Sequence, residues 1–191
     1  MAIWVVRVSV KSIRSKFPEG GITAFNILLH SHLSGRKMKL RHFRDGKELP
    51  WIATDDHYDF NYQQNRLLLE NRQILRGDQR IAECTDSSTH VNPPAGILGG
   101  IRTTDEMCDT YLMYYPRMKN LDICASAFQN FAWLLPTLGI QALDSYFGPN
   151  DPTILSPVSL AGKKFSEVVN AFNWTPELKM GFQNRTRFSD Q

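Results

Sequence analysis

The 191-residue sequence lacks several features that would point to a particular class of protein. No apolar run approaches the roughly 20 residues of a transmembrane helix, so no such helix is expected. No CxxC pair occurs, which disfavours a structural zinc site. Lys and Arg number 22 against 19 Asp and Glu, and this net charge of +3 does not indicate a nucleic-acid-binding protein. The hydrophobic content of 42% is that of an ordinary folded protein.

Cysteines are few, and their number is odd. Cys84, Cys108 and Cys124 leave one thiol over after any disulfide has formed. Two sequons, at Asn173 and Asn184, are glycosylation acceptors, and together with pairable cysteines they favour a secretory compartment. The N-terminal residues contain no convincing signal-peptide core or cleavage site, so any signal is expected either to have been lost or to lie outside this sequence.

Short segments of alternating polar and apolar residues, separated by turn residues, dominate the first two thirds of the sequence. Asp45-Gly46 is a strong hairpin dipeptide, and Pro50 is typical of an edge strand or a bulge. Many short strands at this spacing predict an all-β protein, an antiparallel sandwich or jelly roll. The expected strands are 3–10, 22–33, 36–44, 47–53, 66–75, 79–84 and 110–115.

The last third has a different character. Asp122 can cap a helix over 123–135, which Pro136 would end. Beyond Gly148 the sequence is rich in Pro, Ser and Asn, which predicts an irregular tail with a short helix near 163–172. The C-terminal part is therefore expected to be a helical and irregular extension of the β domain.

His30-Ser-His32 is the first candidate for chemistry. Residues i and i+2 of a strand share one face, with Cα atoms about 6.5–7 Å apart, so two imidazoles there can converge on one metal. A chance pair that binds nothing is the alternative. The third ligand would be one of the remaining histidines or Met107, although methionine more often fills a core. The candidate histidines are His42, His57 and His90.

The segment around Met107 is ambiguous on local grounds. Thr103 and Glu106 form a capping-box pattern, which predicts a helix start. The aromatic residues of 110–115 favour a strand instead.

His30-Ser-His-Leu-Ser-Gly-Arg-Lys37 resembles the His-x-His-x-x-Gly-Arg/Lys segment of the copper type II, ascorbate-dependent monooxygenases, in their dopamine β-monooxygenase-like branch. The later segments resemble that family in order and spacing, over about 20–124. They are Cys84-Thr85, Gly99-Gly100, Asp105-Glu-Met-Cys108, Tyr111 and Tyr114-Tyr-Pro116. The resemblance implies a jelly-roll-type sandwich as the catalytic copper domain, with 1–19 as a non-matching segment and 125–191 as an extension.

The resemblance also implies a ligand set. His30, His32 and Met107 would bind the copper at which oxygen is activated, with ascorbate as the electron donor. Thioether sulfur is soft, so this set favours Cu(I). The family's pairing implies a Cys84–Cys108 disulfide beside the methionine, and it leaves Cys124 unpaired.

The substrate class follows from three further positions. Leu28 stands where peptide-amidating members carry an arginine that grips a carboxylate, so peptide amidation is disfavoured. Tyr111 matches a tyrosine that faces the substrate. Asp109 would attract an amine, or it is an ordinary solvated aspartate. A dopamine-like arylalkylamine, as in catecholamine metabolism, is the expected substrate, and the resemblance implies a secreted or secretory-pathway protein.

Departures from the family set limits on this expectation. Family enzymes carry a second, N-terminal copper domain with an adjacent His-His pair, and this sequence contains no such pair. It is therefore expected to be part of a longer two-copper enzyme and to be inactive alone. A non-catalytic sandwich with a vestigial copper site is the alternative. An apolar docking face left bare would favour self-association.

Overall fold

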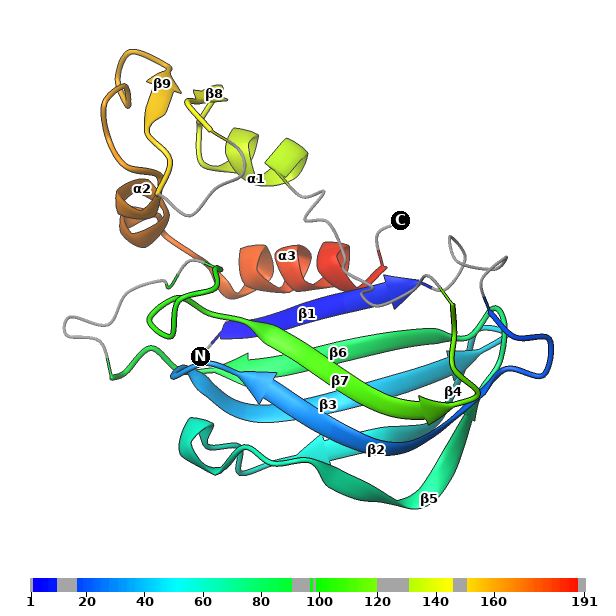
Figure 1. Cartoon of the computed structure of the whole chain (residues 1–191). Coiled ribbons are helices and arrows are strands. Elements are labelled where there is room, and N and C mark those ends of the chain that lie inside the picture. Colours follow the sequence, from blue (N-terminus) through cyan, green and yellow to red (C-terminus); the bar gives the residue numbers. More distant parts are fainter. Residues whose placement is uncertain are drawn as a thin grey trace.

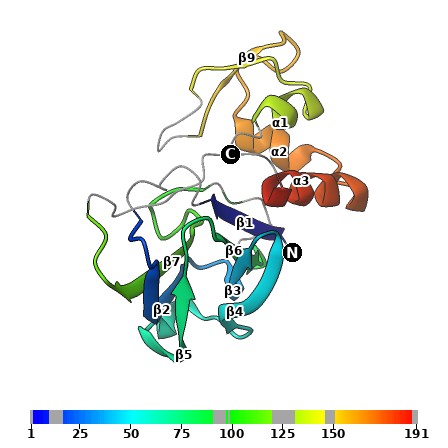
Figure 2. The same ribbon diagram turned by 90° about the vertical axis from the view of Figure 1, so that its right-hand side faces the viewer.

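The computed structural model describes residues 2–9, 17–90, 97, 99–119, 131–145 and 151–188. Its body is a sandwich of two antiparallel sheets, seen edge-on in Figure 2. One sheet has the order β1-β6-β3-β4, and the other has the order β5-β2-β7. Most connections cross from one sheet to the other, as in a jelly roll. The expected all-β sandwich is confirmed.

The strands follow the alternating segments of the sequence closely (Figure 1). Those of the sandwich are β1 (Ala2–Ser9), β2 (Ile22–Ser31), β3 (Gly35–Arg44), β4 (Lys47–Asp55), β5 (Arg66–Ile74), β6 (Gln79–Asp86) and β7 (Cys108–Tyr115). A single 3-10 turn, Phe60–Tyr62, lies between β4 and β5 in this part of the described chain.

The β3–β4 hairpin shows how turn chemistry sets the register. Asp45 and Gly46 both have positive φ, 51° and 75°, as a tight two-residue hairpin turn requires. Pro50 lacks an N–H for the ladder, and β4 is accordingly an edge strand of its sheet. The predictions for both features are confirmed.

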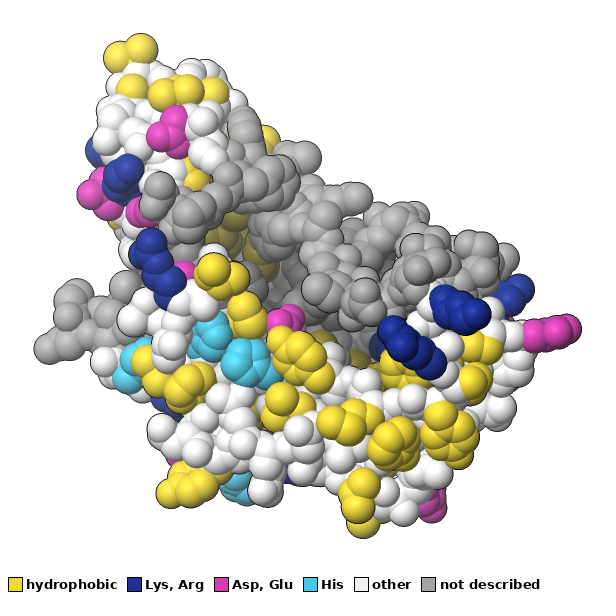
Figure 3. Space-filling view, viewed as in Figure 1, with side chains coloured by type: hydrophobic (Ala, Val, Ile, Leu, Met, Phe, Trp, Pro, Cys, Tyr) yellow, Lys and Arg dark blue, Asp and Glu magenta, His cyan; other side chains and the backbone are white. Residues whose placement is uncertain are grey.

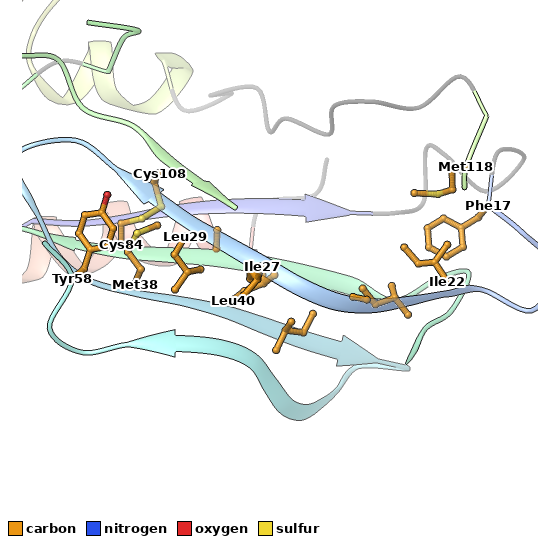
Figure 4. Close-up of a cluster of buried hydrophobic side chains, with 14 residues drawn as sticks. Phe17, Ile22, Ile27, Leu29, Met38, Leu40, Tyr58, Cys84, Cys108 and Met118 are labelled. Carbon is orange, nitrogen blue, oxygen red and sulfur yellow. A yellow bond between two sulfur atoms is a disulfide. The ribbon is translucent and has the colours of Figure 1, made fainter. Parts of the chain in front are cut away.

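The core lies between the two sheets and is made mainly of aliphatic side chains, together with Phe17, Tyr58 and the Cys84–Cys108 pair (Figure 4). The buried apolar residues of β2 alternate with more exposed neighbours, so the other face of this strand is turned away from the core. The buried apolar ones are Ile22, Ala24, Ile27 and Leu29. The partners across the sandwich include Met38, Leu40, Ala82 and Cys84, whereas Ile74 of β5 lies beside Ile22 in the same sheet.

The C-terminal part has a second, smaller core of its own. Its elements are α1 (Phe131–Thr137), β8 (Ala142–Leu143), β9 (Ile154–Ser156), α2 (Phe165–Ala171) and α3 (Pro176–Phe188). The short helix expected near 163–172 is present as α2. α3 lies against β1, in a segment for which the sequence predicted an irregular tail.

The helix expected over 123–135 is tested only in part, because 120–130 lies outside the described residues. Its described part continues to Thr137, so Pro136 lies inside the last turn instead of ending the helix before it. The Thr137 hydroxyl donates a 2.8 Å hydrogen bond to the Trp133 carbonyl, which stabilises this turn. No described helix is long and apolar enough to cross a membrane.

Candidate metal site

His30 is the next-to-last residue of β2, and His32 immediately follows this strand. This end of β2 pairs with the start of β7. Their rings are 5.1 Å apart between centroids and nearly perpendicular. β2 and β7 pair in register, with His30 opposite Asp109 and Ser31 opposite Cys108. Because directly opposed residues of an antiparallel pair share a face, His30 and Asp109 both lie on the outer face of this sheet.

Both imidazoles are held through the same ring nitrogen. His30 Nδ1 lies 2.5 Å from Gln63 Oε1, and His32 Nδ1 lies 3.1 Å from the Asp105 carbonyl oxygen. The Gln63 amide is oriented by its own Nε2, which donates to the Phe60 carbonyl. Both partners are acceptors, so in the neutral rings Nδ1 carries the proton and Nε2 keeps its lone pair. This is the tautomer and orientation that a metal-ligating histidine needs.

Met107 immediately precedes β7. The β2–β7 pairing ends at Ser31 and Cys108, and His32 and Met107 are the next residues along the two segments. Their N–H groups both donate to Glu106 Oε1, at 2.7 and 2.8 Å, so the two backbones lie close together. The Met107 side chain is half-buried. Among the described residues, no group of three or more His, Cys, Asp or Glu is arranged to hold a metal. Two imidazole nitrogens and a thioether fit copper, and the sulfur favours Cu(I).

Ser31, between the two histidines, points into the sandwich and is fixed there. The Tyr58 hydroxyl accepts a hydrogen bond from the Ser31 N–H at 2.9 Å and donates to the Ser31 carbonyl. A Cβ on Gly35 would come within 2.5 Å of the Ser31 hydroxyl oxygen and 2.9 Å of the Tyr58 ring, so only glycine fits there. The backbone that carries the histidine pair is thereby anchored from the core side.

The expected disulfide is present. Cys84 of β6 and Cys108 of β7 are joined, with Cα atoms 5.9 Å apart and a sequence separation of 24 (Figure 4). The bond links the two sheets and attaches the residue after Met107 to the opposite layer. Cys124 lies outside the described residues.

The two substrate-side candidates accompany His30 on the outer face. Tyr111 is opposite Leu28 in the β2–β7 register, and its ring is 6.2 Å from that of His30. Burial, and then the charge of Asp109, raises the pKa of Tyr111. Tyr111 is 53% exposed and Asp109 is half-buried. Figure 3 shows histidine side chains at the surface among hydrophobic ones on this face.

The other candidate histidines lie elsewhere. His42 is 2% exposed and bonded to Asp78, away from the pair. His57 and His90 are exposed, in the loops after β4 and β6. The structure therefore leaves His30 and His32 as the only two described histidines whose rings are in contact.

Sequence reasoning missed two buried carboxylates behind the histidines. Glu106 and Asp86 are 5% and 3% exposed. Glu106 does not start a helix, although the Thr103–Glu106 pattern allowed one, and it accepts hydrogen bonds from the turn after β2 instead. Burial, and then the charge of Glu106, raises the pKa of Asp86 to about 7. No local pattern in the sequence signals either role.

A family model described as "Copper type II ascorbate-dependent monooxygenase, C-terminal domain" matches residues 6–133. This range includes every residue of the site described above. It starts before the segment on which the resemblance was recognised and ends after it.

Curated relatives are similar over most of the chain. It is 38% identical to human "DBH-like monooxygenase protein 1" over 162 residues, which are 85% of this chain and 26% of that protein. It is 37% identical to the Drosophila melanogaster protein "MOXD1 homolog 2" over 90% of this chain and 22% of that protein. Dog "Dopamine beta-hydroxylase" is 36% identical over 62% of this chain and 18% of its own length. The chain thus spans about a quarter or less of these relatives.

Proposed function

Because the chain belongs to the copper type II ascorbate-dependent monooxygenases, we propose that it is an oxygen-activating copper domain in which His30, His32 and Met107 are the ligands. The observation that carries the proposal is the pairing of both Nδ1 atoms with oxygen acceptors. This pairing leaves two Nε2 lone pairs beside the segment that contains Met107.

Copper bound by these three residues would supply the activation of oxygen for hydroxylation of a carbon, with ascorbate as the source of electrons. The protein's own residues prepare the ligands for that chemistry. Gln63 and the Asp105 carbonyl fix the tautomer and the direction of the rings. Tyr58 fixes the backbone between the two rings, and the Cys84–Cys108 disulfide fixes the strand that follows Met107.

The proposed substrate is an arylalkylamine. Asp109 lies opposite His30 and supplies the negative charge that a protonated amine would meet. Leu28 gives this face no cation with which to bind a carboxylate, which speaks against a peptide acid. The Tyr111 ring beside His30 offers an aromatic surface for the substrate.

The isolated chain is proposed to bind copper without sustained turnover. Hydroxylation consumes two electrons from the donor, whereas a chain with one copper holds one. The described residues contain no second cluster of metal-ligand type. A second copper domain, as the family resemblance implies, would complete the enzyme, and the exposed outer-face residues Tyr111, Met113 and Tyr115 offer it an apolar surface.

We also propose that the protein is located in the secretory pathway or outside the cell. The Cys84–Cys108 disulfide requires an oxidising compartment to persist. Asn173 and Asn184 are both exposed, as glycosylation would require.

The ligand set is tested by titrating the metal-free chain with Cu(I) against a chromophoric competitor. The wild type should bind one Cu(I), His32→Ala should abolish tight binding, and Met107→Ile should lower the affinity for Cu(I) more than that for Cu(II). Met113→Ile and His57→Ala are matched controls, because both side chains are exposed and lie outside the set. Equal Cu(I) affinity in the wild type and Met107→Ile would refute the assignment.

Activity is tested with copper, ascorbate and a phenylethylamine, by oxygen uptake together with product identification. The isolated chain should give no sustained product. Continuous formation of hydroxylated amine that disappears in Met107→Ile would show that one copper domain is sufficient, and it would overturn the two-domain proposal.

A further inference from the structure

Glu106 collects hydrogen bonds from both chain segments that carry the proposed ligands. Its Oε1 accepts from the Ser31 hydroxyl at 2.9 Å, the His32 N–H at 2.7 Å and the Met107 N–H at 2.8 Å. Its Oε2 accepts from the Ser34 N–H at 3.0 Å. One buried carboxylate therefore ties the turn after β2 to the residue that precedes β7.

These contacts are strong and depend on one another. Hydrogen bonds to an ionised carboxylate are about twice as strong as neutral ones. The side chain is only 5% exposed, so water does not replace a lost partner. If the carboxylate is removed, the buried N–H groups of His32 and Ser34 and the part-buried N–H of Met107 lose their acceptor, and leaving such groups unsatisfied is unfavourable. Without the carboxylate, we expect the turn after β2 and the segment before β7 to move apart, so that their N–H groups reach water.

A glutamine at this position keeps one acceptor oxygen and replaces the other with an amide group. Its oxygen can still accept from His32 and Met107, but its NH₂ then faces the Ser34 N–H, donor against donor. The substitution therefore preserves size while it breaks the set of four bonds. It is the variant that separates the hydrogen-bonding role of Glu106 from simple packing.

We propose that Glu106 is a positioning residue, whose carboxylate sets the spacing between the His32 backbone and the Met107 backbone and thereby places the thioether relative to the imidazoles. The proposal rests on the proposed function for the metal itself. The four hydrogen bonds to Glu106, here called the Glu106 clamp, are a property of the metal-free chain. Residues behind metal ligands typically change affinity by roughly 10–100-fold when they are mutated.

The first experiment needs no metal. Amide hydrogen exchange of the 191-residue chain is compared between the wild type and Glu106→Gln. The Ser34 amide loses its acceptor and should show the largest increase in exchange rate. The amides of His32 and Met107 should also exchange faster, because a neutral amide oxygen binds them more weakly than the carboxylate does, while those of β3 and β4 are unchanged. Unchanged exchange at all three amides would overturn the proposal, whatever the chain does with copper.

The second experiment is a double-mutant cycle in Cu(I) affinity. Glu106→Gln should lower the affinity roughly 10–100-fold, and the Glu106→Gln/Met107→Ile double variant should lose little more than Met107→Ile alone, because both act on the thioether. Fully additive losses would show that Glu106 does not act through Met107. Glu83→Gln is the matched control, a glutamate 4% exposed on β6 that pairs with Lys39 and Arg41.

The experiments distinguish a failure of the proposed copper function from a failure of the proposed role of Glu106. A wild type without Cu(I) binding, combined with faster amide exchange in Glu106→Gln, rejects the copper function and keeps the clamp. If Glu106→Gln does not fold, Ser31→Ala removes one of the four donors and leaves the Ser31 backbone bonded to Tyr58. It should speed up exchange of the same amides to a smaller extent, and no change there would also overturn the clamp.

Discussion

Two buried aspartates at opposite ends of β6 have opposite surroundings. Asp78 immediately precedes the strand and is 1% exposed, and Asp86 ends it and is 3% exposed. Asp78 accepts hydrogen bonds from the Arg44 guanidinium, the His42 ring and the Leu75 N–H. Neither oxygen of Asp86 has a hydrogen-bond partner among the described residues.

Their pKa values diverge accordingly. Burial acts to raise the pKa of Asp78, but hydrogen bonds from Arg44, Leu75 and His42 outweigh it and lower this pKa to about 2. Burial and the charge of Glu106 raise the pKa of Asp86 to about 7, and the charge of Arg36 offsets this only in part. The Ser31 hydroxyl donates its hydrogen to Glu106 and not to Asp86. Burial also lowers the pKa of His42, so its neutral ring donates to Asp78.

The difference separates a stabilising end of the sandwich from the end that carries the proposed site. Both carboxylate oxygens of Asp78 accept hydrogen bonds. At the Asp86 end, the Ser31 hydroxyl and the N–H groups of His32 and Ser34 donate to Glu106 instead. Unfavourable burial of a charge is typical of functional sites, where geometry is kept at the expense of stability.

The largest effect is expected at Asp78. Asp78→Ala leaves Arg44, His42 and the Leu75 N–H without their acceptor, and breaking such a buried ion pair costs about 3–5 kcal/mol in the free energy of unfolding. Urea denaturation at pH 7 measures this loss. Asp56→Asn is the control, since its carboxylate is 65% exposed and 4.0 Å from Lys37. A loss below 1 kcal/mol would mean that the two ends do not differ as described.

The same variant has a defined pH dependence. The pKa of Asp78 is lowered to about 2 from its ordinary 3.8, so its stabilising contribution is present above about pH 4 and is lost as the pH falls toward 2. The difference between the wild type and Asp78→Ala should therefore narrow below pH 4. A constant difference from pH 7 to pH 2 would contradict this assignment.

An intermediate effect is expected for the disulfide, which joins β6 to β7 near the Asp86 end. Cys84 and Cys108 are 24 residues apart, and closing a loop of that size stabilises the folded state by roughly 3 kcal/mol in the chain-entropy model. The Cys84→Ala/Cys108→Ala double variant should lose about that much, as measured by urea denaturation. Its affinity for Cu(I) should fall as well. Unchanged copper affinity would show that the disulfide does not hold the Met107 segment.

Most strands and turns of the sandwich could be predicted from the sequence, because the residue patterns that specify them are local. The Asp45-Gly46 turn and the period-two alternation of β2 depend on neighbours in sequence, and both were predicted correctly. α3 was missed although its signals are present. The Thr175 hydroxyl accepts from the Leu178 N–H at 3.3 Å, Pro176 occupies the first helical position, and Glu177 lies in the first turn.

The site was readable only in part. The spacing of His30 and His32 placed two imidazoles on one face, whereas only the family resemblance selected Met107 from the candidates for the third ligand. The role of Glu106 could not be assigned, because its pattern with Thr103 suggests a local cap, whereas three of its four donors lie 72 to 75 residues earlier. Asp86 gave no signal, since the burial of one carboxylate depends on the whole fold around it.

The smallest effect is expected at Asp86, and it has the opposite sign. The pKa of Asp86 rises from its ordinary 3.8 to about 7, so the folded state holds a proton that the unfolded state has released, and stability is lost as the pH rises toward 7. Asp86→Asn removes this penalty. It should stabilise the chain by about 1–3 kcal/mol at pH 8, less than the full shift implies, because the amide also needs partners. The gain should vanish near pH 4, and urea denaturation at both pH values measures it. A variant less stable than the wild type at pH 8 would show that the Asp86 carboxylate has a partner that stabilises its charge.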